Sequence, residues 1–127
     1  MNSLVKDFLS QKKFAVVGSF RNESKVAWRI LKTLKNKGYE VIPVNPRLKE
    51  VEGLTCYASI KDIPQGIDVV DIVTPPEVSQ KVVRDCRDKG IKRVWLQPGA
   101  ESKEVIEFCR ENGINVVYNL CLMLEGE

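Results

Sequence analysis

Short, almost wholly apolar runs alternate with amphipathic stretches along this chain. The apolar runs occupy residues 13–18, 39–44, 68–73, 92–96 and 115–118. Runs of this length with little polar alternation are typical of parallel strands that are buried on both faces. Between them, apolar residues recur at helical spacing, as in Ile30, Leu31 and Leu34. The pattern predicts an α/β protein with a five-stranded, mainly parallel sheet and helices on both faces.

Glycine and proline mark the helix boundaries. Gly38, Gly90 and Gly113 each follow an amphipathic stretch and precede an apolar run, where glycine allows the left-handed backbone that ends a helix. Residues 74–77, Thr-Pro-Pro-Glu, predict a helix start with Thr74 as the N-cap. The repeated order of strand, helix and glycine predicts a Rossmann-like three-layer sandwich.

Two segments fall outside this repeat. The leading segment is amphipathic and predicts a helix on the outside of the domain, with apolar positions Leu4, Val5, Phe8 and Leu9. Residues 46–66 read as a long connection with one helical turn near residues 59–62. We find no linker or repeat, so residues 1–127 are expected to form a single domain.

Composition narrows the class of protein. The apolar fraction of 43% and the charged fraction of 29% are ordinary for a globular domain. No apolar run approaches the roughly 20 residues that cross a bilayer, and the first ten residues do not resemble a signal peptide, so we expect no membrane contact and a cytoplasmic location. A net charge of +3 is too small to favour nucleic acid but is compatible with a polyanionic small ligand.

The chain lacks the residues of the commonest catalytic and metal sites. It contains no histidine, which removes Ser-His and Cys-His catalysis. Its four cysteines are far apart and form no CxxC pair, so we expect no metal site. Cys86 and Cys109 lie on the apolar stripes of predicted helices and are expected in the core. No catalytic residue is assigned.

The turn after the first strand is the best candidate site. Residues 18–25 lie where a doubly wound sheet binds its ligand, beyond the carboxyl end of a strand and before a helix. A helix N-terminus offers free N–H groups that suit a phosphate. Gly18 allows close approach, and the expected contacts are Ser19, Phe20, Arg21 and Lys25. The alternative is that Gly18 only permits a tight turn.

The turn lacks the dinucleotide fingerprint GxGxxG. Phe20 and Glu23 stand at its second and third glycine positions. The second strand ends in Asn45, Pro46 and Arg47 instead of the acid that holds the ribose of NAD. Arg47 suits a phosphate on the ribose, as in NADP or coenzyme A. The alternative is an ordinary turn with a solvated arginine.

Two further strand ends complete the expected rim. Thr74, Pro75 and Pro76 follow the third strand and form a rigid apolar lip that suits an adenine. Gln97 and Gly99 follow the fourth strand, and the Gln97 amide suits amide-like groups. Each segment alone is more often a structural turn, but three such strand ends together predict a binding crevice.

Several of these segments resemble a known family. They are Ala-Val-Val-Gly-Ser, Gly-Tyr-Glu-Val-Ile-Pro-Val-Asn-Pro-Arg, Asp-Val-Val-Asp-Ile-Val-Thr-Pro-Pro and Val-Trp-Leu-Gln-Pro-Gly. In this order they resemble the stand-alone CoA-binding domain family (the YccU-like proteins) over residues 8–124. The chain is more distantly similar to the CoA-binding domain of the succinyl-CoA synthetase α subunit.

The resemblance implies coenzyme A bound across the strand ends. It places Gly18, Ser19, Phe20 and Lys25 at the diphosphate, and Gln97 and Gly99 near the pantetheine arm. It also implies that residues 45–47 border the nucleotide and that residues 74–76 close over it. Gly-Ser-Phe replaces the Gly-Ala-Ser of many members, and Val73-Thr74 replaces Phe-Arg, so no arginine contact is expected there. The synthetases use a phosphorylated histidine, which this chain lacks.

Three functions remain open at this point. The first is a non-catalytic coenzyme A or acyl-CoA binding protein, which is not an enzyme. The second is an NADP-binding oxidoreductase or redox sensor. The third is a protein-interaction module derived from an acyl-CoA synthetase subunit, with a homo-oligomer or a synthetase-like partner. If Cys56 or Cys121 faces the pantetheine end, a mixed disulfide with coenzyme A is expected under oxidation.

Overall fold

The computed structural model describes residues 2–22 and 25–122. Its main sheet has five parallel strands in the order β2-β1-β5-β6-β7. These strands are β1 Lys13–Val17, β2 Glu40–Val44, β5 Val69–Ile72, β6 Arg93–Leu96 and β7 Asn115–Val117. Each lies within one of the five apolar runs, and the α/β Rossmann-like prediction is confirmed.

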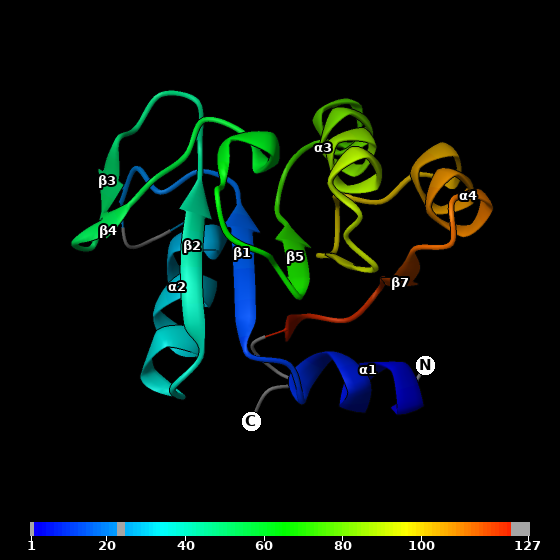
Figure 1. Ribbon diagram of the computed structural model, residues 1–127, viewed down its shortest axis with the longest axis horizontal. Helices are drawn as coiled ribbons and strands as arrows, with labels where there is room; N and C mark the ends of the chain where they lie inside the picture. Colours follow the sequence, from blue (N-terminus) through cyan, green and yellow to red (C-terminus); the bar gives the residue numbers. More distant parts are fainter. Residues whose placement is uncertain (1, 23–24, 123–127) are drawn as a thin grey trace.

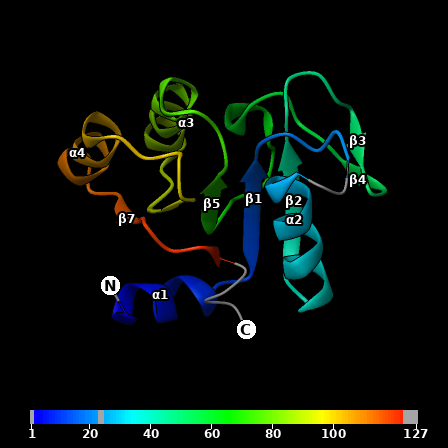
Figure 2. The same cartoon turned by 180° about the vertical axis from the view of Figure 1, so that it is seen from behind.

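Helices cover both faces of this sheet, as Figures 1 and 2 show from opposite sides. The helices are α1 Asn2–Leu9, α2 Val26–Asn36, α3 Pro76–Lys89 and α4 Lys103–Glu111, with a short 3-10 turn η1 Ile60–Asp62. Apolar side chains of α1 and α2 pack on one face of the sheet, and those of η1, α3 and α4 pack on the other. The strands are therefore buried on both sides, which explains why they contain so few polar residues.

Alternate residues of each strand contribute to the two cores. In β1, Phe14 and Val16 pack with α1 and α2, whereas Ala15 and Val17 pack with α3 and α4. Cys86 and Cys109 are fully buried in the second of these cores, as predicted. Burial raises the pKa of Cys86 above its ordinary range and that of Cys109 to about 11, so both thiols stay neutral.

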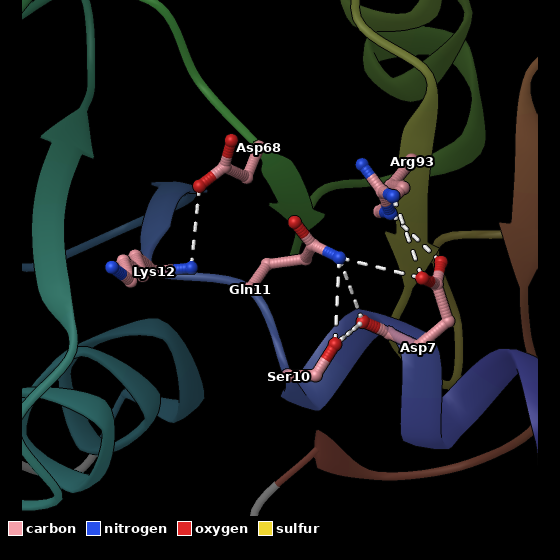
Figure 3. Close-up of polar contacts among 6 residues, drawn as sticks. All are labelled: Asp7, Ser10, Gln11, Lys12, Asp68 and Arg93. Atoms are coloured by element: carbon pink, nitrogen blue, oxygen red, sulfur yellow. Dashed lines mark hydrogen bonds and ion pairs between the residues drawn. The ribbon is translucent and has the colours of Figure 1, made fainter.

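The leading helix α1 packs against the outer side of the sheet. Phe8 is fully buried, with its ring edge-on to Trp95 at a centroid distance of 6.1 Å. Figure 3 shows the polar contacts that hold this helix at the amino ends of the strands. Arg93 Nε donates to Asp7 Oδ2 over 2.8 Å, and Asp68 Oδ2 accepts from the backbone N–H of Lys12 over 3.2 Å. The expected outer position of this segment is confirmed.

The connection between β2 and β5 contains structure that was not predicted. The helical turn is confirmed as η1, but a small antiparallel hairpin precedes it, formed by β3 Glu50–Val51 and β4 Leu54–Thr55. Glu52 and Gly53 both have positive φ, 51° and 76°, which closes the hairpin in two residues. Glu-Gly is a weaker turn signal than Asn-Gly or Asp-Gly, and each strand is too short to show a pattern.

The start of α3 differs from the prediction. Pro75 is the N-cap residue and Pro76 is the first helical residue, so Thr74 lies one position too early to cap the helix. The Thr74 hydroxyl instead pairs with Ser79 Oγ at 2.8 Å. Ser79 is fully buried, and a buried hydroxyl needs a partner.

Among the described residues, no helix is long and apolar enough to cross a membrane.

Candidate functional site

The strand order reverses between β1 and β5. From β1 the chain passes through α2 to β2 on one side, and the later strands extend from β5 on the other. A crevice beyond the carboxyl ends of the strands is expected at this point of an open parallel sheet. In Figure 1 these ends lie at the top for β1 and β2, at the end of the molecule opposite α1.

Gly18 lies at this reversal, where the neighbouring atoms leave no room for a side chain. Its N–H donates to Val44 O over 3.3 Å, which ties the turn to the end of β2. A Cβ atom at this position would lie 2.7 Å from Ala27 Cβ and 3.0 Å from Val73 O. Gly18 therefore lets α2 and the end of β5 approach the turn closely, so the structural reading of this glycine has a definite physical basis.

The first hollow at this edge lies beyond β1 and β2. It is lined by Ser19, Phe20, Arg21, Asn45, Arg47 and Leu48, and its volume is about 270 Å³. We call it the arginine hollow. The side chains of Arg21 and Arg47 are exposed, and neither guanidinium has a hydrogen bond or ion pair within residues 2–22 and 25–122. Five residues that were predicted at two separate strand ends thus line one hollow.

Two of these five residues hold the hollow in shape. Asn45 Nδ2 donates to Gly18 O over 2.7 Å, and Asn45 Oδ1 accepts from the Arg47 N–H over 2.8 Å. This amide joins the end of β1 to the turn after β2. The Phe20 ring is 6% exposed and packs in the core below, so it forms the floor of the hollow.

The second hollow lies beyond β5 and β6. It is lined by Val73, Thr74, Pro75, Pro76, Pro98, Gly99 and Ala100, and its volume is about 390 Å³. We call it the proline hollow. The Gly99 N–H faces both carboxylate oxygens of Glu101, at 2.9 and 3.3 Å. The structure thus brings together Thr74, Pro75, Pro76 and Gly99, on the far side of the strand reversal from the arginine hollow.

Gln97 does not lie where the sequence placed it. Its side chain is 2% exposed and points into the core shared with α1 and α2. Its Nε2 donates to Asp71 Oδ1 over 2.7 Å, and its Oε1 accepts from the Leu122 N–H over 3.2 Å. Because both polar ends are engaged below the rim, Gln97 has no group free for a ligand in this arrangement.

Asp71 is a polar residue that the sequence analysis missed. It is fully buried in β5, and its Oδ2 has no hydrogen-bond partner among the described residues. Burial raises the pKa of Asp71 to about 7, and the hydrogen bond from Gln97 opposes that rise. The sequence does contain a signal for it, because Asp71 is a single acidic residue within an apolar strand, and burying a charge is costly unless the charge is paired or hydrogen-bonded.

Lys25 and the two remaining cysteines stand apart from the hollows. Lys25 is half-buried just before α2, and it lines neither hollow. Cys56 is buried behind the arginine hollow, with its Sγ 3.7 Å from Asn45 O, and burial raises the pKa of this thiol. Cys121 is half-buried and also lines neither hollow. A neutral, buried Cys56 is a poor nucleophile for a mixed disulfide.

Within the described part of the chain, no group of three or more His, Cys, Asp or Glu residues is placed to hold a metal ion.

The family model that describes the CoA binding domain matches residues 12–127. The chain belongs to the CoA binding domain family. The recognition made from the strand-end motifs is therefore confirmed.

Relatives of this family member fall into two size classes. It is 29% identical to the α subunit of acetate–CoA ligase (ADP-forming) II from Pyrococcus furiosus, over 91% of the chain but 28% of that subunit. It is 29% identical to the uncharacterized protein YneT from Bacillus subtilis, over 93% of the chain and 88% of YneT. A conserved hypothetical protein from Pyrococcus furiosus has a solved structure with 42% identity and a TM-score of 0.86, covering 91% of this chain and 99% of that one.

Proposed function

We propose that this CoA binding domain holds coenzyme A or an acyl-CoA across the carboxyl ends of its strands and performs no chemistry itself. The observation that carries the proposal is the pair of hollows on either side of the strand reversal. One of them contains two guanidinium groups that have no hydrogen bond or ion pair among the described residues. Coenzyme A carries a diphosphate and a ribose 3′-phosphate, and it therefore needs cationic groups at one end only.

The arginine hollow supports phosphate binding through charge and hydrogen bonding together. Arg21 and Arg47 approach it from the ends of β1 and β2, and the exposed Ser19 is also part of the lining. A guanidinium group can donate two parallel hydrogen bonds to two oxygens of one phosphate, which fixes the orientation of the phosphate as well as attracting its charge. We assign the diphosphate to the turn of Ser19 and Arg21 and the 3′-phosphate to Arg47, with Lys25 adding positive charge nearby.

The proline hollow supports the less charged parts of the ligand. Pro75, Pro76 and Pro98 give it rigid apolar walls that suit the adenine ring, and Gly99 leaves room for the pantetheine arm. A complete ligand site is typically about 300–1,000 Å³. The arginine hollow, at about 270 Å³, is smaller than this, and the proline hollow, at about 390 Å³, is near the lower end, so one extended ligand that spans both is the better match. Gln97 is left out of this contact set because its polar atoms are engaged in the core.

A binding role without catalysis agrees with the relatives. The chain spans 28% of the α subunit of acetate–CoA ligase (ADP-forming) II and 88% of YneT. We infer that the activity of the longer relatives also needs segments that this chain does not match. A synthetase-like partner, or a second copy of the chain, is then the natural recipient of the bound coenzyme.

Titration calorimetry with three related nucleotides tests this function. We expect coenzyme A to bind and dephospho-CoA to bind about tenfold more weakly, because one phosphate contact at an exposed site contributes about 1.4 kcal/mol. NADPH, which carries a ribose phosphate but no pantetheine, is expected to give no heat at the same concentrations. Absence of heat with coenzyme A would remove the proposal. Equal binding of the first two ligands would remove the contact to the 3′-phosphate, and tight NADPH binding would favour the redox alternative.

A further inference from the structure

Asp71 lies in an apolar environment that offers its carboxyl group one hydrogen bond. The register places it between Val16 of β1 and Trp95 of β6, on the face that α1 and α2 cover. Oδ1 accepts from Gln97 Nε2 over 2.7 Å, whereas Oδ2 has no partner within residues 2–22 and 25–122. A neutral acid tolerates such a site far better than a carboxylate does.

The same face is closed by a short segment of the chain after β7, residues 120–122, which we call the strap. Its carbonyl at Leu120 accepts from Trp95 Nε1 over 2.8 Å, and its N–H at Leu122 donates to Gln97 Oε1 over 3.2 Å. Leu122 is 2% exposed and shares a core with Phe8. In Figures 1 and 2 this red segment runs back from β7 toward the β1 end of α1.

In the part of the chain that the structure describes, no ionic partner balances a charge on Asp71. On the elements around it, Asp7 of α1 pairs with Arg93 of β6, and Lys32 of α2 pairs with Glu52. On β1, Lys13 pairs with Glu40. The remaining ionisable groups on these elements and the strap are Lys6, Lys25, Arg29, Lys35 and Cys121. None of these groups contributes to the pKa of Asp71, which is raised by burial and lowered by the Gln97 hydrogen bond.

We propose that Asp71, Gln97 and the strap form a proton-controlled latch, in which the strap is docked while Asp71 is neutral and loosens when Asp71 releases its proton to solvent. Gln97 is the mechanical link, because one amide bonds both the Asp71 carboxyl and the Leu122 N–H. The strap opens before the centre of the sheet does. Within the described residues, two side-chain bonds from Trp95 and Gln97 hold the strap, whereas β5 and β6 are each held by ladders on both sides. The latch does not depend on which ligand binds the strand ends.

The direction of the pH effect follows from linkage. The pKa of Asp71 is about 7 in the closed state because the carboxyl is buried. In the proposed open state water reaches the carboxyl and its pKa falls toward the ordinary value of 3.8, so the closed state binds the proton more tightly. The closed strap is therefore most stable below about pH 4, loses stability as the pH rises from 4 to 7, and loses no more above that. Within this window the ratio of open to closed strap rises by up to tenfold per pH unit.

Hydrogen exchange of the Leu122 amide, read by NMR, tests the latch. We expect its protection factor, corrected for the intrinsic exchange rate at each pH, to fall at least tenfold between about pH 5 and pH 7 and to level off by about pH 8. In Asp71→Asn the side-chain oxygen still accepts from Gln97 but carries no proton to lose, so the protection factor stays constant. Asp68→Asn changes a half-buried carboxyl that accepts from the N–H groups of Lys12 and Lys13 and not from Gln97, and it keeps the slope of the natural protein.

The natural protein alone is sufficient if the Asp71→Asn variant does not fold. The carboxyl carbon of Asp71, followed by NMR, is expected to titrate well above the ordinary range of aspartic acids and in step with the Leu122 protection factor. A Leu122 protection factor that is independent of pH between about 5 and 7, or a slope that persists in folded Asp71→Asn, overturns the proposal. Titration of the Asp71 carboxyl near its ordinary value overturns it as well.

Discussion

Replacing Arg21 and Arg47 together by alanine is expected to weaken the binding of coenzyme A by about one hundredfold. A hydrogen bond to a charged group contributes about 1.5–3 kcal/mol when it is well formed. Both guanidinium groups are exposed, so water and salt screen them, and we expect about tenfold for each. Calorimetric titration of the double variant measures the loss directly.

A second double variant controls for the change in overall charge. Lys81 and Arg84 are exposed on α3 and line neither hollow. Replacing both by alanine lowers the formal net charge from +3 to +1, as the arginine variant does, and is expected to change the affinity less than twofold. If the two double variants lose affinity equally, the loss comes from the lower net charge of the protein, and the arginine hollow is not the phosphate site.

Gly18→Ala is expected to destabilise the fold by about 2–3 kcal/mol, which is the usual cost of overpacking a close contact. The added Cβ would lie 2.7 Å from Ala27 Cβ, against a first turn of α2 that cannot move without shifting the helix. Ala27→Gly removes that contact, at a cost of up to about 1 kcal/mol for a glycine in a helix. Urea unfolding of both single variants and the double variant measures the coupling between the two positions.

The double variant is expected to be at least 1 kcal/mol more stable than the sum of the two single changes predicts. Rescue is incomplete because Val73 O still lies 3.0 Å from the new Cβ. Gly38→Ala is a contrasting change, since nothing lies near its Cβ position but its φ of 93° is unfavourable for alanine. Simple additivity of Gly18→Ala and Ala27→Gly would mean that close packing of α2 is not why this position is glycine.

The sheet could be predicted from the sequence because its strands are buried on both faces. In β1 every residue after Lys13 is buried, so the strand appears as an uninterrupted apolar run. The rim residues could be predicted for a related reason. Parallel strands end at one edge of the sheet, so Arg21 and Arg47 meet in one hollow although each belongs to a different strand end.

The direction of single side chains at strand ends could not be predicted. Gln97 follows β6 and was assigned to the rim, but the alternation of β6 continues through it and turns it to the same face as Trp95. The burial of Asp71 could not be predicted either, because it depends on α1, α2 and the strap, which cover this face of the sheet. Only the strand register shows that these two polar residues meet.

Local geometry also determined the remaining differences. The hairpin of β3 and β4 depends on the positive φ of Glu52, a conformation that a glutamate does not signal. The Thr74 hydroxyl does not cap α3 because it forms a hydrogen bond with the Ser79 hydroxyl. Lys25 was assigned to the diphosphate from its place before a helix, and that contact stays a prediction.

An NMR titration that follows the backbone amides during addition of coenzyme A tests directly whether the ligand binds at the carboxyl ends of the strands. We expect the largest shift changes on Ser19, Arg21, Arg47 and Gly99. A hollow with lysines lies at the opposite edge, lined by residues that include Lys12, Lys37 and Gly38. Shift changes centred on that hollow, or none at saturating coenzyme A, would show that coenzyme A does not bind at the strand ends.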